Sequence, residues 1–164
     1  MPESTCPSCG YSIAVETPAL SEPPFPATPA CYASYLDLSA YNAERARGDF
    51  LHQAAVDAYA AQHPGPPAKP ITLWFALVGL HLAIDRGRSG RQVQLAHTRL
   101  ARRRRVWHPL PPPADLTGVT AADVLHHAPG DDRDAALMRW AGQVWTRWGP
   151  VHDTIESLAI EHDL

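Results

Sequence analysis

The apolar and polar positions along the chain predict a series of helices separated by breaks rich in proline and glycine. From Cys31 to about Arg45, apolar side chains recur every three or four residues, which is the spacing of one helical face. A second such stripe follows Asp49, a residue type that commonly caps helix N-termini, and stops at His63 before a Pro-Gly pair. Two helices joined by a short connection are therefore expected in residues 31–63.

The rest of the pattern predicts three or four more helices. Residues 71–86 are apolar almost all round, so this segment is expected to form the central helix. Further helical segments begin after Gly90, at a capping box over residues 120–123, and near residue 135, the last ending or kinking at Gly149-Pro150. No segment alternates like a β-strand. We therefore expect an all-α fold, a compact bundle of about five to six helices.

The N-terminal segment, residues 1–30, differs from the rest of the chain. It contains a Cys-Pro-Ser-Cys-Gly run and then five prolines, the first of them Pro18. Because proline lacks an amide donor and fixes φ, this segment is not expected to be helical and should lie on the surface, where it needs an anchor. We expect a single globular unit with two parts: a proline-rich zinc-knuckle arm at residues 1–30 and a helical domain at residues 31–164.

Charge and composition narrow the class of protein. The chain has 164 residues and a formal net charge of -3, so there is no global basic field that would favour nucleic acid or a membrane surface. The longest apolar run, residues 71–84, is shorter than the roughly 20 residues that span a bilayer. The N-terminus lacks the basic start and apolar stretch of a targeting signal. We expect a cytoplasmic protein.

The three cysteines indicate a zinc site. Cys6 and Cys9 form a C-x-x-C knuckle that can chelate one zinc ion, and Cys31 is the remaining thiol. Tetrahedral zinc then needs one more ligand, which must be a histidine. If the first two helices form an antiparallel hairpin, Cys31 returns close to His63. The sequence therefore predicts a zinc ion held by these three cysteines and His63, and this ion would anchor the arm.

Other interpretations of the cysteines stay open. A thioredoxin-like redox pair is one, although such pairs normally follow a strand and open a helix, which the prolines around Cys6 disfavour. Three buried thiols without a metal are another. The fourth zinc ligand could also be His52 or His81 in place of His63.

Several short motifs are spread over most of the chain. They are Cys6-x-x-Cys9-Gly10, Cys31, Asp57-Ala58-Tyr59 with Gln62-His63-Pro64-Gly65, His81-Leu82, and Trp140-Ala141 with Val144-Trp145 and Trp148. Together these motifs resemble an uncharacterised family of bacterial proteins, a domain of unknown function. Because that family has no assigned activity, the resemblance supports the choice of residues and implies no reaction.

A second group of residues supports a catalytic alternative. If the second and third helices form a hairpin, His52 lies level with residues near His81. Asp85 lies one helical turn beyond His81, where its carboxylate can orient the imidazole ring. His152 could approach the same region from beyond the break at residues 149–150. Three histidines from separate helices can hold a divalent ion with positions open for water, as a metal-dependent hydrolase requires. The structural alternative is a core histidine satisfied by Asp85.

The arginine run Arg102, Arg103, Arg104 and Arg105 is followed by Trp107, a combination that can grip phosphate and stack a base. Four consecutive arginines spread around a helix, so a solvated helix end is favoured over nucleic-acid binding.

The sequence as a whole favours a zinc-binding helical protein that acts as a binding or interaction module. Its zinc is expected to be mainly structural, and its partner is an unidentified protein or small molecule. The alternatives are a metal-dependent hydrolase with a histidine-ligated ion and a weak nucleic-acid binder that uses Arg102 to Arg105.

Overall fold

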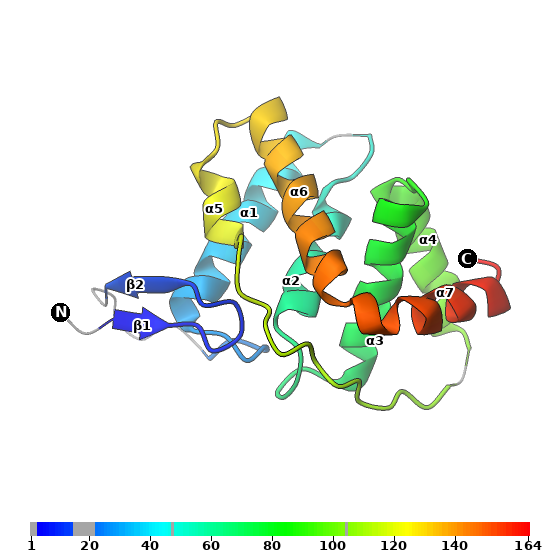
Figure 1. The fold of residues 1–164 in the computed structure, drawn as a ribbon. Helices are drawn as coiled ribbons and strands as arrows, with labels where there is room; N and C mark the ends of the chain where they lie inside the picture. Colours follow the sequence, from blue (N-terminus) through cyan, green and yellow to red (C-terminus); the bar gives the residue numbers. More distant parts are fainter. Residues whose placement is uncertain (1–2, 15–21, 47, 104) are drawn as a thin grey trace.

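In the computed structural model, most of the chain forms helices that pack side by side, and a small β-hairpin projects from one end (Figure 1). The structure describes residues 3–14, 22–46, 48–103 and 105–164. Within these residues there are seven α-helices and one two-stranded sheet. The elements are β1 (Glu3–Thr5), β2 (Ser12–Ala14), α1 (Pro29–Arg45), α2 (His52–Gln62), α3 (Pro70–Leu80), α4 (Gly90–Ala101), α5 (Ala121–His126), α6 (Asp131–Arg147) and α7 (His152–Glu161).

The predicted helical architecture is confirmed, with differences at the ends of elements. The capping box of α5 is present, because the Thr120 side chain accepts from the backbone of Asp123 and the Asp123 side chain accepts from the backbone of Thr120. Helix α2 starts later than predicted, with Leu51 as N-cap in place of Asp49. The break at residues 149–150 is a short 3-10 turn that separates α6 from α7.

The hairpin corrects the expectation that no strand is present. Glu3 pairs with Ala14 and Thr5 with Ser12 in an antiparallel ladder. Strands of three residues are too short to show an alternating apolar pattern, which is why the sequence gives no signal for them. Residues 1–2 and 15–21 of the predicted arm, including Pro18, lie outside the described residues.

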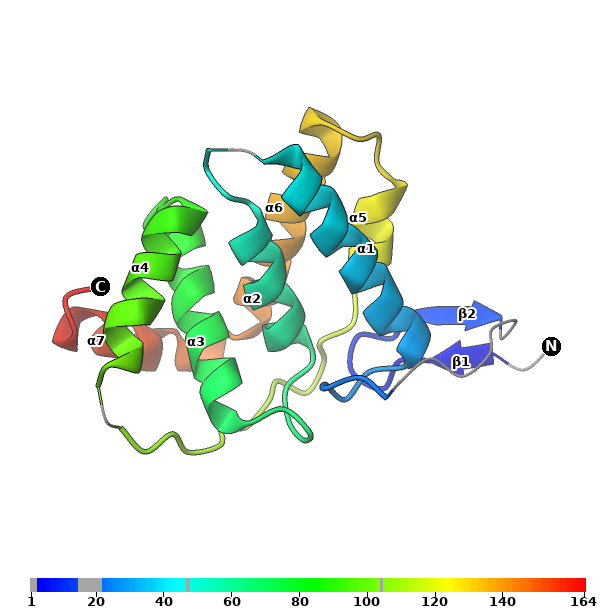
Figure 2. The same ribbon diagram turned by 180° about the vertical axis from the view of Figure 1, so that it is seen from behind.

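Helix α2 lies at the centre of the bundle, a place predicted for α3. It packs against α1, α3, α4 and α6, and nine of its eleven residues are buried. Five of its residues are alanines, and their small side chains let neighbouring helices approach on several sides. Helix α3 is the more apolar of the two, but Ile71 at its start is partly exposed. Figure 2 shows α2 between α1 and α3 from the opposite side.

Helix α3 does not continue as an α-helix to residue 86 as predicted. From His81 to Asp85 it widens into a π-helical turn, η1, in which the backbone amide of Arg86 donates to the carbonyl of His81 at 3.3 Å. Hydrogen bonds of this i to i−5 type are rare and occur mostly as single turns within α-helices. Gly87 follows with φ +61°, the left-handed conformation expected of a glycine just beyond a helix.

The two tryptophans of α6 and the one at its C-cap fill the core, as predicted. Trp140, Trp145 and Trp148 are each 2% exposed or less. Trp148 donates to the carbonyl of Ala61 at 3.0 Å, so these rings contact α2 as well as the neighbouring helices. None of the described helices combines the length and the apolarity that crossing a bilayer requires.

Candidate metal centre

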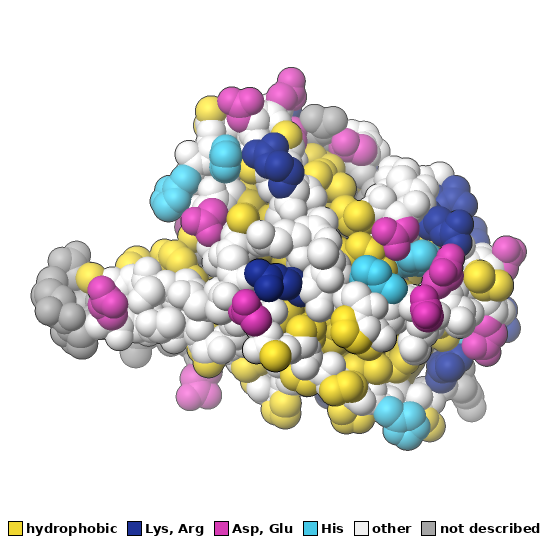
Figure 3. All heavy atoms as spheres, in the orientation of Figure 1, with side chains coloured by type: hydrophobic (Ala, Val, Ile, Leu, Met, Phe, Trp, Pro, Cys, Tyr) yellow, Lys and Arg dark blue, Asp and Glu magenta, His cyan; other side chains and the backbone are white. Residues whose placement is uncertain are grey.

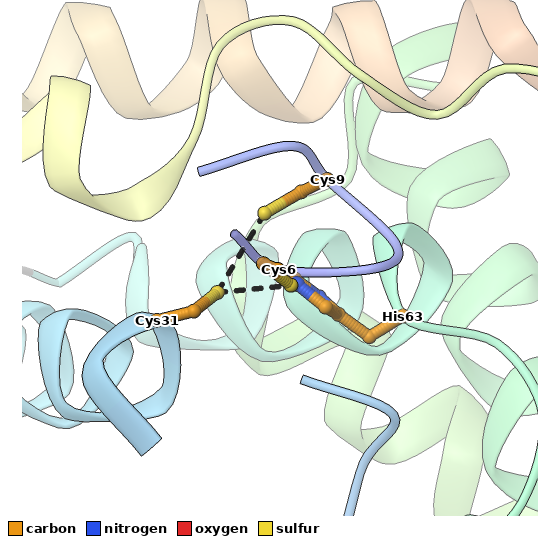
Figure 4. Close-up of side chains that lie close together, drawn as sticks. All are labelled: Cys6, Cys9, Cys31 and His63. Atoms are coloured by element: carbon orange, nitrogen blue, oxygen red, sulfur yellow. Dashed lines mark hydrogen bonds between the residues drawn. The ribbon is translucent and has the colours of Figure 1, made fainter. Parts of the chain in front are cut away.

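Three separate segments bring Cys6, Cys9, Cys31 and His63 together, and these four residues are called the candidate centre below (Figure 4). Cys6 and Cys9 come from the turn of the hairpin, Cys31 from the first turn of α1, and His63 from the end of α2. Their ligand atoms all lie within 4.8 Å of one another, and all four residues are buried. The predicted pairing of Cys31 with His63 is thereby confirmed.

Backbone hydrogen bonds hold the tight turn of the hairpin that carries Cys6 and Cys9. The amide of Cys6 donates to the carbonyl of Tyr11 at 2.8 Å, and the amide of Gly10 donates to the carbonyl of Cys6 at 3.0 Å. Gly10 has φ +78°, and a Cβ there would lie 3.1 Å from Cγ2 of Thr117. A glycine at this position therefore allows both the tight turn and close packing against the loop before α5.

The distances between the donor atoms fit one tetrahedral ion. Sγ of Cys31 lies 3.6 Å from Sγ of Cys9 and 3.3 Å from Nε2 of His63. Zinc bonds of about 2.3 Å to sulfur and 2.0 Å to nitrogen place two tetrahedral sulfur donors about 3.8 Å apart, and a sulfur and a nitrogen donor about 3.5 Å apart. All three cysteines are free thiols. The cluster therefore needs only small adjustments to close around an ion.

Hydrogen bonds fix which nitrogen of His63 faces the thiols. Its Nδ1 lies 2.8 Å from the carbonyl oxygen of Tyr59, which can only accept, so Nδ1 carries the proton and Nε2 keeps a free lone pair. The hydroxyl of Tyr59 lies 3.5 Å from Sγ of Cys31, and its ring stacks on His63 with centroids 4.0 Å apart. Tyr59 therefore orients two of the four residues.

The electrostatics of the three thiols favour a cation among them. Hydrogen bonds with Cys31 and Cys9 hold the pKa of Cys6 far below that of a free thiol. Hydrogen bonds with Cys6 and Cys9, together with burial, raise the pKa of Cys31. For Cys9 the hydrogen bond with Cys31 lowers the pKa, but Cys6 and burial outweigh it and raise the pKa to about 11. When one thiol has ionised, its negative charge therefore opposes ionisation of the other two. A divalent cation bound between them would offset the repulsion between the thiolates.

A buried polar network holds the end of α2 in place beside the candidate centre. Gln62 donates through Nε2 to the carbonyls of Leu116 and Val119, at 3.1 and 2.9 Å, and accepts from Nε1 of Trp140 at 3.0 Å. These contacts fix the residue directly before His63 to α6 and to the loop before α5. The motifs include Gln62 and Trp140, but their pairing across 78 residues could not be found without the fold.

The residues of the catalytic alternative are only partly brought together. His81 bonds through Nδ1 to Asp85 at 2.9 Å, and Asp85 also accepts from Nε1 of Trp145 at 3.0 Å. His152 stacks on Trp145 with centroids 3.8 Å apart and bonds through Nε2 to its carbonyl at 2.9 Å. Among the described residues, His52, His81 and His152 form no group able to hold one ion. A catalytic role for His81, Asp85, His52 or His152 stays a prediction.

The arginine run lies beyond α4 and not within it, since the helix ends at Ala101 and Arg102 is its C-cap. Arg105 pairs with Glu161 at 3.3 Å, and its guanidinium lies 5.8 Å from the ring centroid of Trp107. Arg104 lies outside the described residues. Nucleic-acid binding by this run stays a prediction.

Fold and centre together define a mostly helical protein with a site of three cysteines and one histidine. The chain belongs to a family of unknown function, DUF5946, whose model matches residues 4–149. This confirms the resemblance seen in the motifs. The matched span includes all four residues of the candidate centre, whereas His152 lies beyond it. Comparisons with curated proteins and with solved structures gave no match.

Proposed function

We propose that the candidate centre binds one zinc ion, that this zinc is structural, and that the protein acts as a binding module. The observation that carries the proposal is the complete donor set: three thiols and one imidazole with their ligand atoms within 4.8 Å of one another. Thiolates with imidazole in tetrahedral array are typical of zinc sites. The orientation of His63 by the Tyr59 carbonyl supplies the outer contact that zinc-bound histidines usually have.

A structural role follows from closure of the site. Catalytic zinc keeps one position for water or substrate, whereas structural zinc is held by four protein ligands. Here four protein donors are present, and each of the four residues is 3% exposed or less. Such a centre leaves neither an open position nor a path for a substrate.

The zinc would hold the hairpin against the helices. The two strands, residues 3–5 and 12–14, are largely exposed, and the residues of this segment that are buried are Cys6 and Cys9. Two such short strands bury too little apolar surface to be stable alone. A metal shared with Cys31 and His63 supplies the missing attachment.

The binding role is supported by a cleft next to the candidate centre. A cavity of about 120 Å³ is lined by His63, by the Pro64–Pro70 segment and by apolar residues that include Leu73 and Leu110. Because His63 is both a metal ligand and part of the wall, zinc would hold this wall in shape. An apolar concave surface of this kind suits a small apolar group of a partner protein or ligand.

Replacing zinc by cobalt tests the proposal. We expect the protein purified without a histidine tag to hold one equivalent of metal, and its Co(II) form to show the strong visible bands of a tetrahedral thiolate site. Adding azide should leave those bands unchanged, because no position is open. Bands that shift with azide would show an exchangeable coordination position and favour a catalytic metal.

His63→Ala should lose the bands, whereas His81→Ala, outside the centre, should keep them.

A further inference from the structure

The long connection between α4 and α5 shows a three-residue periodicity in its exposure. In residues 105–116, called the proline segment below, every third side chain is partly or fully buried and all the others are exposed. The inward side chains are Trp107, Leu110, Pro113 and Leu116. Three residues per turn is the repeat of a polyproline II helix, not that of an α-helix or a strand. The segment therefore lies on the protein along one ridge and turns its other two ridges to solvent.

The sequence of the proline segment itself imposes this conformation. Proline fixes φ at about −65°, and a residue before proline is confined to ψ of about +120° to +160°. Both restrictions act on Pro111 and Pro112, and one of them acts on each of Pro109, Leu110 and Pro113. The four X-Pro peptide bonds of the segment are trans. The backbone is therefore rigid before a partner arrives, so binding costs little conformational entropy.

Both ends of the proline segment are tied to the helices. Nε1 of Trp74 donates to the carbonyl of His108 at 2.7 Å, and the rings of Trp74 and Trp107 lie 5.6 Å apart between centroids. At the other end, the carbonyl of Leu116 accepts from Nε2 of Gln62 at 3.1 Å. These contacts use the inward ridge and the ends of the segment, and they leave its outward ridges to solvent.

One outward ridge is apolar although it faces solvent. It contains Val106, Pro109 and Pro112, which lie three residues apart, and Val106 is 74% exposed. The backbone carbonyls of residues 109–113 accept no hydrogen bond from any described residue. Figure 3 shows apolar side chains gathered along the lower edge of the molecule, where the segment runs in Figure 1. Two prolines three residues apart, with free carbonyls, are what a polyproline II ligand presents to a groove lined by aromatic side chains.

Basic side chains precede the proline segment. Arg102 and Arg103 are exposed and have no acidic partner among the described residues, whereas Arg105 pairs with Glu161 at 3.3 Å. Figure 3 shows Lys and Arg side chains at the right end of the same lower edge. The ridges of a polyproline II helix look much alike in both directions, so a charge at one end fixes the direction in which the helix binds. A complementary partner therefore has an acidic side chain beside its groove.

We propose that the proline segment is the ligand of a partner protein whose groove is lined by aromatic side chains and has an acidic group at one end. Val106, Pro109 and Pro112 lie in the groove, where tryptophan N–H or tyrosine O–H groups of the partner donate to the free carbonyls. Arg103 pairs with the acidic group. The proposal gives the proposed binding module a kind of partner and so rests on that role, but it makes no use of the zinc.

Purified SH3, WW and EVH1 domains test the proposal, because each has an aromatic-lined groove for proline-rich segments. The full zinc-loaded chain is titrated into each isotope-labelled domain, and the backbone resonances of the domain report where the chain binds. At least one domain should bind, with shifts confined to its groove, and a decaproline peptide should displace the chain. No binding to any of the three domains, or shifts only outside the groove, would overturn the proposal.

Matched variants identify the ridge that binds. Pro109→Ala combined with Pro112→Ala should weaken binding about tenfold, because both prolines of the outward ridge are lost. Arg103→Gln should weaken binding about threefold, as expected for one exposed ion pair. Pro24→Ala removes an exposed proline from the N-terminal arm and should change binding less than twofold. Unchanged binding by the double variant, or an equal loss with Pro24→Ala, would overturn the proposal.

The cobalt bands of the candidate centre separate this proposal from the proposed zinc site. All the variants should keep those bands, because the replaced residues are exposed and lie outside the centre. A weakened double variant with intact bands shows that the ridge, and not the fold, was changed. A chain that holds no metal but binds through Pro109 and Pro112 would support this proposal and contradict the zinc site.

Discussion

Tyr59 contacts two residues of the candidate centre, His63 and Cys31. Its carbonyl orients His63, and its hydroxyl lies 3.5 Å from the sulfur of Cys31. Burial raises the pKa of the phenol, so the hydroxyl stays protonated and can donate to a thiolate. This contact lowers the negative charge that the metal must balance at Cys31.

Tyr59→Phe keeps the ring and its stacking but removes the hydroxyl. We expect zinc affinity to fall by about tenfold, which is typical for the loss of an outer contact to a metal ligand. Tyr32→Phe is the control, since Tyr32 belongs to the same aromatic group and lies 6.0 Å from Tyr59 between centroids. Competition with a chromogenic chelator measures both variants. Equal affinities for Tyr59→Phe and the unmodified protein would show that the hydroxyl plays no part.

Position 79 has room only for glycine, because the carboxylate of Asp57 occupies the space where a side chain would lie. A Cβ on Gly79 would overlap Oδ2 and Cγ of Asp57 and force α2 and α3 apart. Gly79→Ala should therefore lower the free energy of unfolding by about 1–3 kcal/mol, the usual cost of overpacking. Gly142 is the control, because it lies in α6 with open space around it, and Gly142→Ala should raise stability by up to about 1 kcal/mol. Urea unfolding of both variants checks the signs, and a stabilising Gly79→Ala would contradict this packing.

Asp57 makes stability depend on pH. Burial raises its pKa well above the usual value, although the hydrogen bond from Gln53 at 2.9 Å opposes the shift. The native state therefore keeps a proton that the unfolded chain loses above about pH 4, so stability falls as pH rises toward the folded-state pKa. Asp57→Asn keeps the acceptor for Gln53 and cannot ionise.

The stability difference between Asp57→Asn and the unmodified protein should increase in favour of the variant from about pH 5 to pH 8. Both proteins share the candidate centre, so the pH dependence of metal binding cancels in the comparison. Unfolding in urea at several pH values measures the difference. Parallel curves would mean that Asp57 is not responsible.

At the scale of elements, the hairpin and the end of α2 meet at the candidate centre. Within the hairpin turn, the backbone amide of Cys6 donates to the carbonyl of Tyr11 at 2.8 Å, and that of Gly10 donates to the carbonyl of Cys6 at 3.0 Å. Removal of zinc with a chelator should abolish the protection of these two amides from hydrogen exchange, because the hairpin loses its attachment. Backbone amides in the middle of α6 should keep most of their protection from hydrogen exchange. If Cys6 and Gly10 stay protected without metal, the hairpin is held by packing alone.

The elements also show which parts of the structure the sequence could predict. The pairing of Cys31 with His63 was predictable, because two helices with a short connection must return the chain to its starting level. The strands of the hairpin were not, because three residues are too few for a pattern. The widened turn at His81 gave no signal either, since a π-helical turn needs no special residue types. The bond from Trp145 to Asp85 joins residues 60 positions apart and depends on how α6 packs.

At the scale of the whole molecule, the candidate centre lies beside the hairpin, whereas α4, α7 and the C-terminus lie at the opposite end (Figure 1). The candidate centre joins the hairpin to α1 and α2, and its donors are buried. The bundle between the two ends is held by Trp140 and Trp148, which bond to the last two residues of α2. Loss of zinc is therefore expected to disturb one end first and to leave the other folded.

The proposed zinc ion is held by three sulfurs and one nitrogen. X-ray absorption at the zinc edge, on protein purified without a histidine tag, measures this directly. We expect one zinc per chain with three sulfur neighbours at about 2.3 Å and one nitrogen neighbour at about 2.0–2.1 Å. Absence of stoichiometric zinc, with Cys6, Cys9 and Cys31 all readily alkylated, or a zinc shell with oxygen in place of one of the sulfurs, would contradict it.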